Sequence, residues 1–171
     1  MQKSQLCVQK EKPEKNPGNP KVVLDTNILV SAFLSPAGPA SQIVYLAWQG
    51  KLQVCYNQEI MDEYGEVLSR PKFKFKIPKS DIEEVVETIK NDGLFFDVQP
   101  SDFSMPDETD RVFYDVAKSA EAFLITNNTQ HYPKDPIILT PDNIVDRFID
   151  PFNKSPDFYK AQVLERFRRD R

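Results

Sequence analysis

The chain has 171 residues and a net charge of −4, and 40% of its residues are hydrophobic. A chain of this length and apolar content suits one globular domain with short extensions. No apolar run approaches the roughly 18 residues that cross a bilayer, so we expect no membrane span, and residues 1–20 lack an apolar stretch of secretory length, so we expect no signal peptide.

The charge is unevenly spread along the chain. Residues 1–20 carry four Lys against two Glu, and residues 157–171 carry five Lys or Arg against three Asp or Glu. With +2 at each end, the remaining 136 residues hold a net charge of −8. Such an acidic body disfavours nucleic-acid binding through charge alone, but it suits carboxylates that share a bound cation. Cys7 and Cys55 fit neither a metal-binding nor a disulfide pattern, so we expect a reducing, cytoplasmic compartment.

Predicted strands and helices alternate from residue 21 onward. Residues 1–20 are rich in Lys, Glu, Pro and Asn and have little to bury, so we expect a disordered or loosely ordered tail. A main domain over 21–150 precedes a C-terminal helical extension over 151–171. In chain order the patterns predict a strand at 21–25, helices at 26–34 and 38–50, a strand at 52–56, helices at 57–70 and 78–93, a strand at 94–98, a helix at 107–120, strands at 122–126 and 137–139, and a helix at 140–149.

The alternation predicts parallel strands that are joined by helical crossovers and covered on both faces, which is an α/β fold. In such sheets ligands bind beyond the carboxyl ends of the strands. Asp25 ends the first predicted strand, and Thr126 is followed by Asn127 and Asn128 at the end of a later one. We therefore expect Asp25 to stand where a ligand binds.

The predicted helix at 57–70 directs one acid toward the core. Its apolar stripe includes Val67, and Glu63 lies about 40° from Val67 around the helix axis. The other acids of this helix point toward solvent: Glu59, Asp62 and Glu66. Glu63 is therefore the acid of this helix that we expect at the core border.

The predicted helix at 107–120 gives a similar result. Asp110 projects beside Ala117, on the edge of the apolar face and in the first turn. Asp115 faces away from that edge, and Asp107 stands at the helix start. Asp110 is therefore the acid of this helix that we expect near the core.

Each acid also has a structural interpretation, which stays open. Asp25 suits a helix N-cap, Asp107 and Asp110 suit a capping pair, and Glu63 suits a solvated surface position. Ionised carboxylates on core-facing borders nevertheless repel one another unless a cation lies among them. We therefore favour a cation site.

Three blocks of the sequence, VVLDTNILVSAFL, NQEIMDEYGEVLSRPKF and PDETDRVFYDVAKSAEAFLITNN, resemble the PIN-domain nucleases. The resemblance is closest to the branch described as toxin components of bacterial toxin–antitoxin pairs, and it covers about residues 21 to 150. It implies a three-layer α/β/α sandwich with a central parallel sheet. It also implies an endoribonuclease that hydrolyses phosphodiester bonds of single-stranded RNA with Mg²⁺ or Mn²⁺ held by carboxylates.

The resemblance assigns the catalytic and metal-binding positions. The first acid of the family falls on Asp25, the acid of its middle helix on Glu63, and the acid seven residues before a small Ala on Asp110. Asp107 is a further metal-ligand candidate, and Asn27 matches the polar residue that supports the first Asp.

The fourth acid of the family departs from the common pattern. It usually stands in the triplet TGD after a strand, whereas this chain has TNN, so that Asn128 occupies its place. An Asn ligates through its carbonyl oxygen but brings no charge. We therefore expect one firmly held metal, and a second mainly when the substrate phosphate supplies ligands.

Basic residues supply candidate RNA contacts. Arg70, Lys72, Lys74 and Lys76 alternate with aromatic residues in RPKFKFK, a pattern that tracks a nucleic-acid backbone and stacks bases. The same pattern suits an amphipathic connector with buried Phe and solvated Lys. His131, in a loop after TNNTQ, is a further candidate for contact with phosphate.

Other functions fit the sequence less well. A phosphatase of the haloacid-dehalogenase type needs a second Asp where this chain has Asn27, and a receiver domain needs an acidic pair near its start. The remaining alternative is a non-catalytic PIN-like module that binds RNA or protein. As partners we expect single-stranded RNA, an antitoxin protein and a second copy of the chain in a homo-oligomer (dimer).

Overall fold

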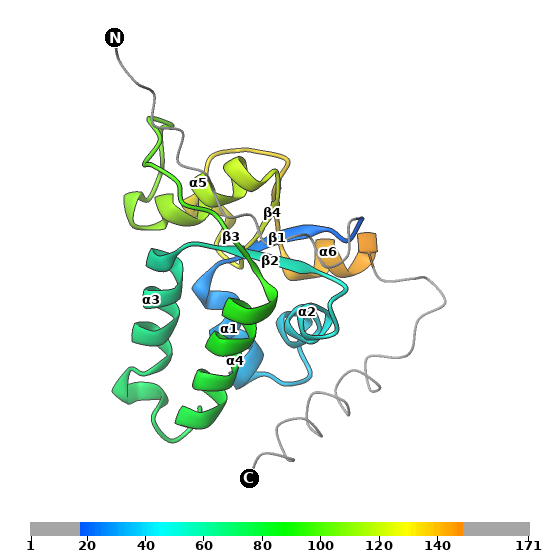
Figure 1. The fold of residues 1–171 in the computed structure, drawn as a ribbon, viewed down its shortest axis with the longest axis vertical. Helices are drawn as coiled ribbons and strands as arrows, with labels where there is room; N and C mark the ends of the chain where they lie inside the picture. Colours follow the sequence, from blue (N-terminus) through cyan, green and yellow to red (C-terminus); the bar gives the residue numbers. More distant parts are fainter. Residues whose placement is uncertain (1–17, 149–171) are drawn as a thin grey trace.

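The computed structural model describes residues 18–148, which are coloured along the chain in Figure 1. Most of the tail predicted over 1–20, and all of the extension predicted over 151–171, lie outside the described residues.

Within the described range, the strands and helices follow one another in the predicted order. The strands are β1 (Lys21–Leu24), β2 (Gln53–Tyr56), β3 (Leu94–Phe95), β4 (Phe123–Ile125) and β5 (Ile138–Leu139). The helices are α1 (Thr26–Leu34), α2 (Pro39–Trp48), α3 (Gln58–Leu68), α4 (Lys79–Asp92), α5 (Arg111–Ala120) and α6 (Pro141–Phe148). Short 3-10 helices are η1 (Pro71–Phe73), η2 (Glu108–Asp110) and η3 (Thr129–His131).

Two elements differ from their predicted extent by more than two residues at one end. β3 ends at Phe95 rather than at residue 98. Beyond it the chain leaves the sheet and runs beside α5, where the backbone N–H of Ser101 donates a hydrogen bond to Asp115 Oδ2. The helix predicted over 107–120 is divided into η2 and α5, and Asp110 between them has φ −94° and ψ 0°. This break changes the direction of the chain at one of the predicted site residues.

The five strands form one parallel sheet in the order β3-β2-β1-β4-β5. β1 lies at the centre and reads Lys-Val-Val-Leu, and its last three residues are buried, as a strand covered on both faces requires. The predicted α/β fold with a central parallel sheet is therefore confirmed.

Helices cover both faces of the sheet. α5 packs against β1, β2 and β4 on one face, where Phe113, Val116 and Ala117 are fully buried. α1, α2 and α4 lie on the other side of the strands (Figure 1), and α6 packs against α2. The small Ala117 and Ala120 let α5 approach the central strands closely. The result is the three-layer α/β/α arrangement.

The strand order creates a switch point beside β1. From β1 the chain builds outward through β2 to β3, and it then returns to place β4 on the opposite side of β1. At such a point the connections leave in opposite directions and open a crevice at the carboxyl ends of the two strands. Asp25 follows β1, and Thr126 follows β4.

Within residues 18–148, no single helix is long and apolar enough to cross a membrane. α1 and α2 together have the required length and composition but meet at a bend of 106°.

Candidate active site

Asp25 lies directly beyond β1 and is only 5% exposed. Its backbone N–H donates to Ile125 O at 3.0 Å, which continues the pairing of β1 with β4. Its Oδ2 accepts hydrogen bonds from Thr126 Oγ1 and from Tyr132 Oη, both at 2.8 Å. Its Oδ1 accepts from Asn27 N at 3.3 Å, so the N-cap interpretation of Asp25 also describes the structure. All three donors are neutral, so they orient the carboxylate without cancelling its charge.

Thr126 fixes the orientation of Asp25. Its hydroxyl oxygen receives hydrogen bonds from Asn27 Nδ2 at 3.3 Å and from Asn128 N at 2.9 Å. Because both of these groups are donors, the hydroxyl proton of Thr126 is directed to Asp25. Asn27 Oδ1 accepts from Asn127 N at 3.1 Å, which defines the orientation of the Asn27 amide. Asn27 thus supports Asp25 through Thr126.

Glu63 lies on α3 at the border of the buried face, as its position in the helix predicts. The neighbouring acids Glu59, Asp62 and Glu66 are all exposed. Glu63 Oε1 accepts a hydrogen bond from Thr26 Oγ1 at 2.6 Å. Burial raises the pKa of Glu63 most, and the charges of Asp25 and Asp110 raise it further, against the lowering effect of the Thr26 hydrogen bond.

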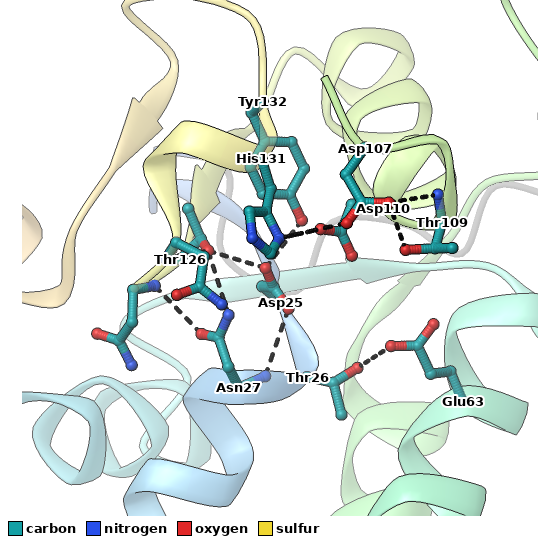
Figure 2. A network of polar contacts seen from close by, with 12 residues as sticks. Asp25, Thr26, Asn27, Glu63, Asp107, Thr109, Asp110, Thr126, His131 and Tyr132 are labelled. Atoms are coloured by element: carbon teal, nitrogen blue, oxygen red, sulfur yellow. Dashed lines mark hydrogen bonds and ion pairs between the residues drawn. The ribbon is translucent and has the colours of Figure 1, made fainter. Parts of the chain in front are cut away.

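Asp110 stands at the junction of η2 and α5, and its side chain makes no capping bond to α5. Its Oδ2 lies 2.9 Å from Nδ1 of His131. Burial raises the pKa of Asp110 most, and the charges of Asp25 and Asp107 add to this, whereas His131 lowers it. Figure 2 shows Asp25, Glu63 and Asp110 on three different elements around the end of β1.

The side chains of Asp25, Glu63 and Asp110 gather around the end of β1 (Figure 2), but Asp25 and Glu63 are outside the described group whose ligand atoms lie within 4.8 Å of one another, which is Asp107, Asp110 and His131. No Lys or Arg in the described part of the chain forms an ion pair with Asp25, Glu63 or Asp110. Burial is the main cause that raises the pKa of Glu63 and Asp110, and the negative charges of neighbouring acids, Asp25 among them, raise both further. Carboxylate oxygens are the ligands that Mg²⁺ and Mn²⁺ prefer.

Asp107 caps η2, as its capping interpretation predicts. It accepts from Thr109 N at 3.0 Å and from Thr109 Oγ1 at 2.7 Å, and these bonds are the main cause that lowers its pKa. Its Oδ2 is also 3.6 Å from Nδ1 of His131. One donor atom each of Asp107, Asp110 and His131 lie within 4.8 Å of one another, which is close enough to share an ion.

Two polar residues of the site were missed by the sequence patterns. Tyr132 is 3% exposed, and burial raises the pKa of its hydroxyl far above the usual range, with Asp25 and Asp110 adding to the shift. Tyr132 therefore stays protonated and donates to Asp25. Thr26 binds Glu63 as described above. No periodicity marks either residue, and the one available signal for Tyr132 was its position next to His131.

Asn128 approaches the site through its backbone. Its N–H donates to Thr126 Oγ1, and its side chain is half-buried. That side chain makes no hydrogen bond to any residue within 18–148. Asn127 is exposed and donates through Nδ2 to Ser31 Oγ at 3.1 Å.

The basic RPKFKFK segment lies apart from the carboxylates. Arg70 comes seven residues after Glu63, about 10 Å further along the axis of α3, and pairs with Glu66 at 3.1 Å. The lysines follow in the connection between α3 and α4, at the far end of this helix pair in Figure 1. Phe73 is buried, as a connector predicts, but Phe75 is 96% exposed.

Asp115 does not face solvent. It points away from the carboxylates, as its helix position predicts, but it is only 5% exposed, because it accepts hydrogen bonds from the backbone and hydroxyl of Ser101. The segment after β3 thus covers this side of α5. The helical pattern of α5 cannot predict this contact, because Ser101 belongs to a different segment of the chain.

Comparisons with known proteins agree with this geometry. The sequence profile of the family described as PIN domain matches residues 21–130. An uncharacterized protein of Methanocaldococcus jannaschii is 27% identical over 124 residues, which are 72% of this chain and 77% of that protein. No solved structure matches. The matched range contains Asp25, Glu63, Asp110 and Asn128 but stops one residue before His131.

Proposed function

Because this chain belongs to the PIN domain family, whose members are generally metal-dependent nucleases, we propose that it is an endoribonuclease. It hydrolyses phosphodiester bonds of single-stranded RNA with Mg²⁺ or Mn²⁺. The observation that supports this most strongly is the set of three acids, Asp25, Glu63 and Asp110, at the switch point of the sheet without a Lys or Arg partner among the described residues.

The contribution of the chain to the reaction is to hold carboxylates in fixed positions, where they can bind a cation. Asp25, Glu63 and Asp110 are the metal ligands, with Asp107 as a further candidate. Asp25 is held in one orientation by Thr126 and Tyr132. A divalent cation held by these residues would supply the positive charge that offsets the scissile phosphate, and would lower the pKa of a bound water for in-line attack. Because Asn128 brings no charge, we propose one firmly held cation.

We further propose a biological role and partners for this chain. The resemblance to toxin components supports a role as the toxin of a toxin–antitoxin pair, with an antitoxin protein and a second copy of this chain as partners. We also propose a reducing cytoplasm as the compartment, because neither Cys7 nor Cys55 belongs to a disulfide pattern in the sequence.

A non-catalytic PIN-like module that binds RNA or protein is the second candidate. The observation that favours it is Asn128, an uncharged residue where the family commonly has an acid. Such a module would bind RNA through the same face without cleaving it.

Cleavage of end-labelled RNA with and without metal separates the two candidates. We expect the wild type to cut single-stranded RNA with Mg²⁺ or Mn²⁺ and not with chelator. Glu63→Gln removes one proposed ligand, and we expect it to lose cleavage. Asp62→Asn is the matched control, because Asp62 is adjacent but exposed and bound only by Gln58 at 2.8 Å. Binding of RNA without metal-dependent cleavage by the wild type would instead establish the non-catalytic module.

A further inference from the structure

His131 is the single histidine of the chain and lies against the carboxylate cluster. Its Nδ1 points toward Asp110 in Figure 2, at 2.9 Å from Asp110 Oδ2, and is 3.6 Å from Asp107 Oδ2. The side chain of His131 is 37% exposed. We propose that His131 is a ligand of the bound cation and that its nitrogen makes the site prefer Mn²⁺ to Mg²⁺. This inference rests on the proposed function for the presence of a metal, but it concerns a residue outside the matched family range.

The backbone places the imidazole ring at the cluster. η3 ends at His131, whose N–H donates to Asn128 O at 3.0 Å. Asp107 N donates to His131 O at 3.3 Å, so the turn after β4 and the turn before α5 are joined at this residue. The next residue, Tyr132, is anchored to Asp25. The ring is therefore held between two acids by contacts on either side of it.

The distances suit a shared ion. In an octahedral site with ligands at about 2.0–2.1 Å, adjacent ligand atoms are about 3 Å apart and opposite ones about 4 Å. The separations of Nδ1 from Asp110 and Asp107 are 2.9 and 3.6 Å, and all three donor atoms lie within 4.8 Å. Only small side-chain movements are needed to bring these atoms around one cation.

A nitrogen ligand changes which metal is favoured. Mg²⁺ prefers oxygen ligands and near-ideal octahedral geometry, whereas imidazole suits transition metals, and affinity for mixed oxygen and nitrogen sites rises from Mn²⁺ onward. In this chain the position where the family commonly has a carboxylate holds a neutral amide, Asn128, and η3, three residues further on, brings the imidazole of His131 to Asp107 and Asp110. The donor set therefore shifts toward Mn²⁺.

The contrasting role for His131 is to orient Asp110 by donating a hydrogen bond to it. Loss of affinity on mutation does not distinguish the two roles, because removing a partner that only orients a ligand already costs about 10- to 100-fold in metal affinity. The decisive readouts are therefore contact between nitrogen and metal, and the ratio of the Mn²⁺ and Mg²⁺ affinities.

Pulsed electron paramagnetic resonance of bound Mn²⁺ measures that contact directly. An imidazole nitrogen bound to Mn²⁺ produces a ¹⁴N hyperfine coupling, and with a single histidine in the chain this coupling can only belong to His131. We expect the coupling in the full-length wild type without RNA, and we expect its loss in His131→Asn and His131→Ala.

Calorimetric titration with Mn²⁺ and with Mg²⁺ provides the second readout. His131→Asn places an oxygen the same number of bonds from the backbone as Nδ1, so the site becomes all-oxygen. We expect its preference for Mn²⁺ over Mg²⁺ to fall about tenfold relative to the wild type. Asp62→Asn should leave both affinities unchanged, and because His131 is partly exposed the variants should keep the wild-type melting temperature without metal.

The outcomes separate this inference from the proposed function. Wild-type protein that binds Mn²⁺ without ¹⁴N coupling, or a His131→Asn variant with an unchanged metal preference, would overturn the inference and leave the proposed nuclease standing. Wild-type protein that binds no Mn²⁺ at all would overturn both.

Discussion

At the scale of single residues, the orientation of Asp25 is determined by groups that are distant in sequence. Its carboxylate receives hydrogen bonds from Asn27, Thr126 and Tyr132, and none of these groups carries a positive charge. These donors place no positive charge beside a nearly buried carboxyl group, and a buried charge without a partner is costly for folding unless a cation offsets it.

Asp25→Asn should abolish cleavage and keep the fold. An amide retains one oxygen for Thr126 and Tyr132, so the main loss is the long N-cap bond at 3.3 Å, worth about 0.5–1 kcal/mol. Removal of the charge should lower the cleavage rate by at least about 100-fold. The measurement is single-turnover cleavage of single-stranded RNA together with thermal unfolding, and wild-type cleavage by this variant would refute the assignment of Asp25.

Asn128→Asp should increase metal affinity. A carboxylate at this position adds charge where the family commonly has an acid, and the amide that it replaces hydrogen-bonds to no other described residue through its side chain. Repulsion from Asp110 should lower the stability of the metal-free variant. Calorimetric titration with Mn²⁺ and the cleavage rate test this, and an affinity equal to that of the wild type would show that Asn128 does not face the metal.

At the scale of elements, the α3–α4 connection contains an exposed aromatic residue among basic ones. Phe75 is 96% exposed, and Lys74 Nζ lies 6.0 Å from the centre of its ring. The buried Phe73 belongs to the core, so only part of the RPKFKFK segment fits an ordinary connector.

Replacing both Lys74 and Phe75 with Ala should weaken RNA binding without changing the maximal cleavage rate. Loss of base stacking on Phe75 should cost about 1–3 kcal/mol of binding free energy per base. Loss of one phosphate contact should reduce the slope of log affinity against log salt concentration by about 0.7 for a single strand. Lys79→Ala is the control, because Lys79 is exposed and pairs with Glu83 on α4. If this variant has the RNA affinity and salt dependence of the wild type, the RPKFKFK segment does not contact RNA and only connects α3 with α4.

At the scale of the whole molecule, the acidic cluster links stability to metal. Mg²⁺ or Mn²⁺ at millimolar concentration should raise the melting temperature by mass action, because the unfolded chain does not hold the three acids together. Asp110→Asn should reduce this rise. A wild-type melting curve that is insensitive to either ion would contradict the cluster.

The same cluster should make metal-free stability depend on pH. The pKa of Glu63 and of Asp110 is raised in the folded chain, so the folded state binds these protons more tightly than the unfolded state, where carboxyl pKa values are about 4. The ionised groups therefore destabilise the fold above their folded pKa, and the penalty disappears as the pH falls toward about 4. In chelator, Asp110→Asn should melt higher than the wild type near neutral pH, and the difference should shrink on acidification, whereas Asp62→Asn should show no such trend.

Local patterns predicted much of this fold and part of the site. α1 begins at Thr26 and ends at Leu34 as predicted, because its cap and its apolar spacing lie within one short segment. The helical position of Glu63 was also sufficient to separate it from its exposed neighbours. The burial of Asp115 and the bond from Tyr132 to Asp25 depend on segments that meet only in the folded sheet, so no local pattern contains them.

The long separation between Asp25 and Tyr132, 107 positions along the chain, has a consequence for protein synthesis. Chains emerge from the ribosome N-terminus first at about 5–20 residues per second, so roughly 5–20 seconds pass between the appearance of the two residues. During that interval β1 has no β4 beside it, and Asp25 lacks both hydroxyl donors. Under the proposed function, the growing chain therefore cannot yet cleave the RNA around it. The order of strands in the sheet delays the assembly of the site until nearly the whole domain has been made.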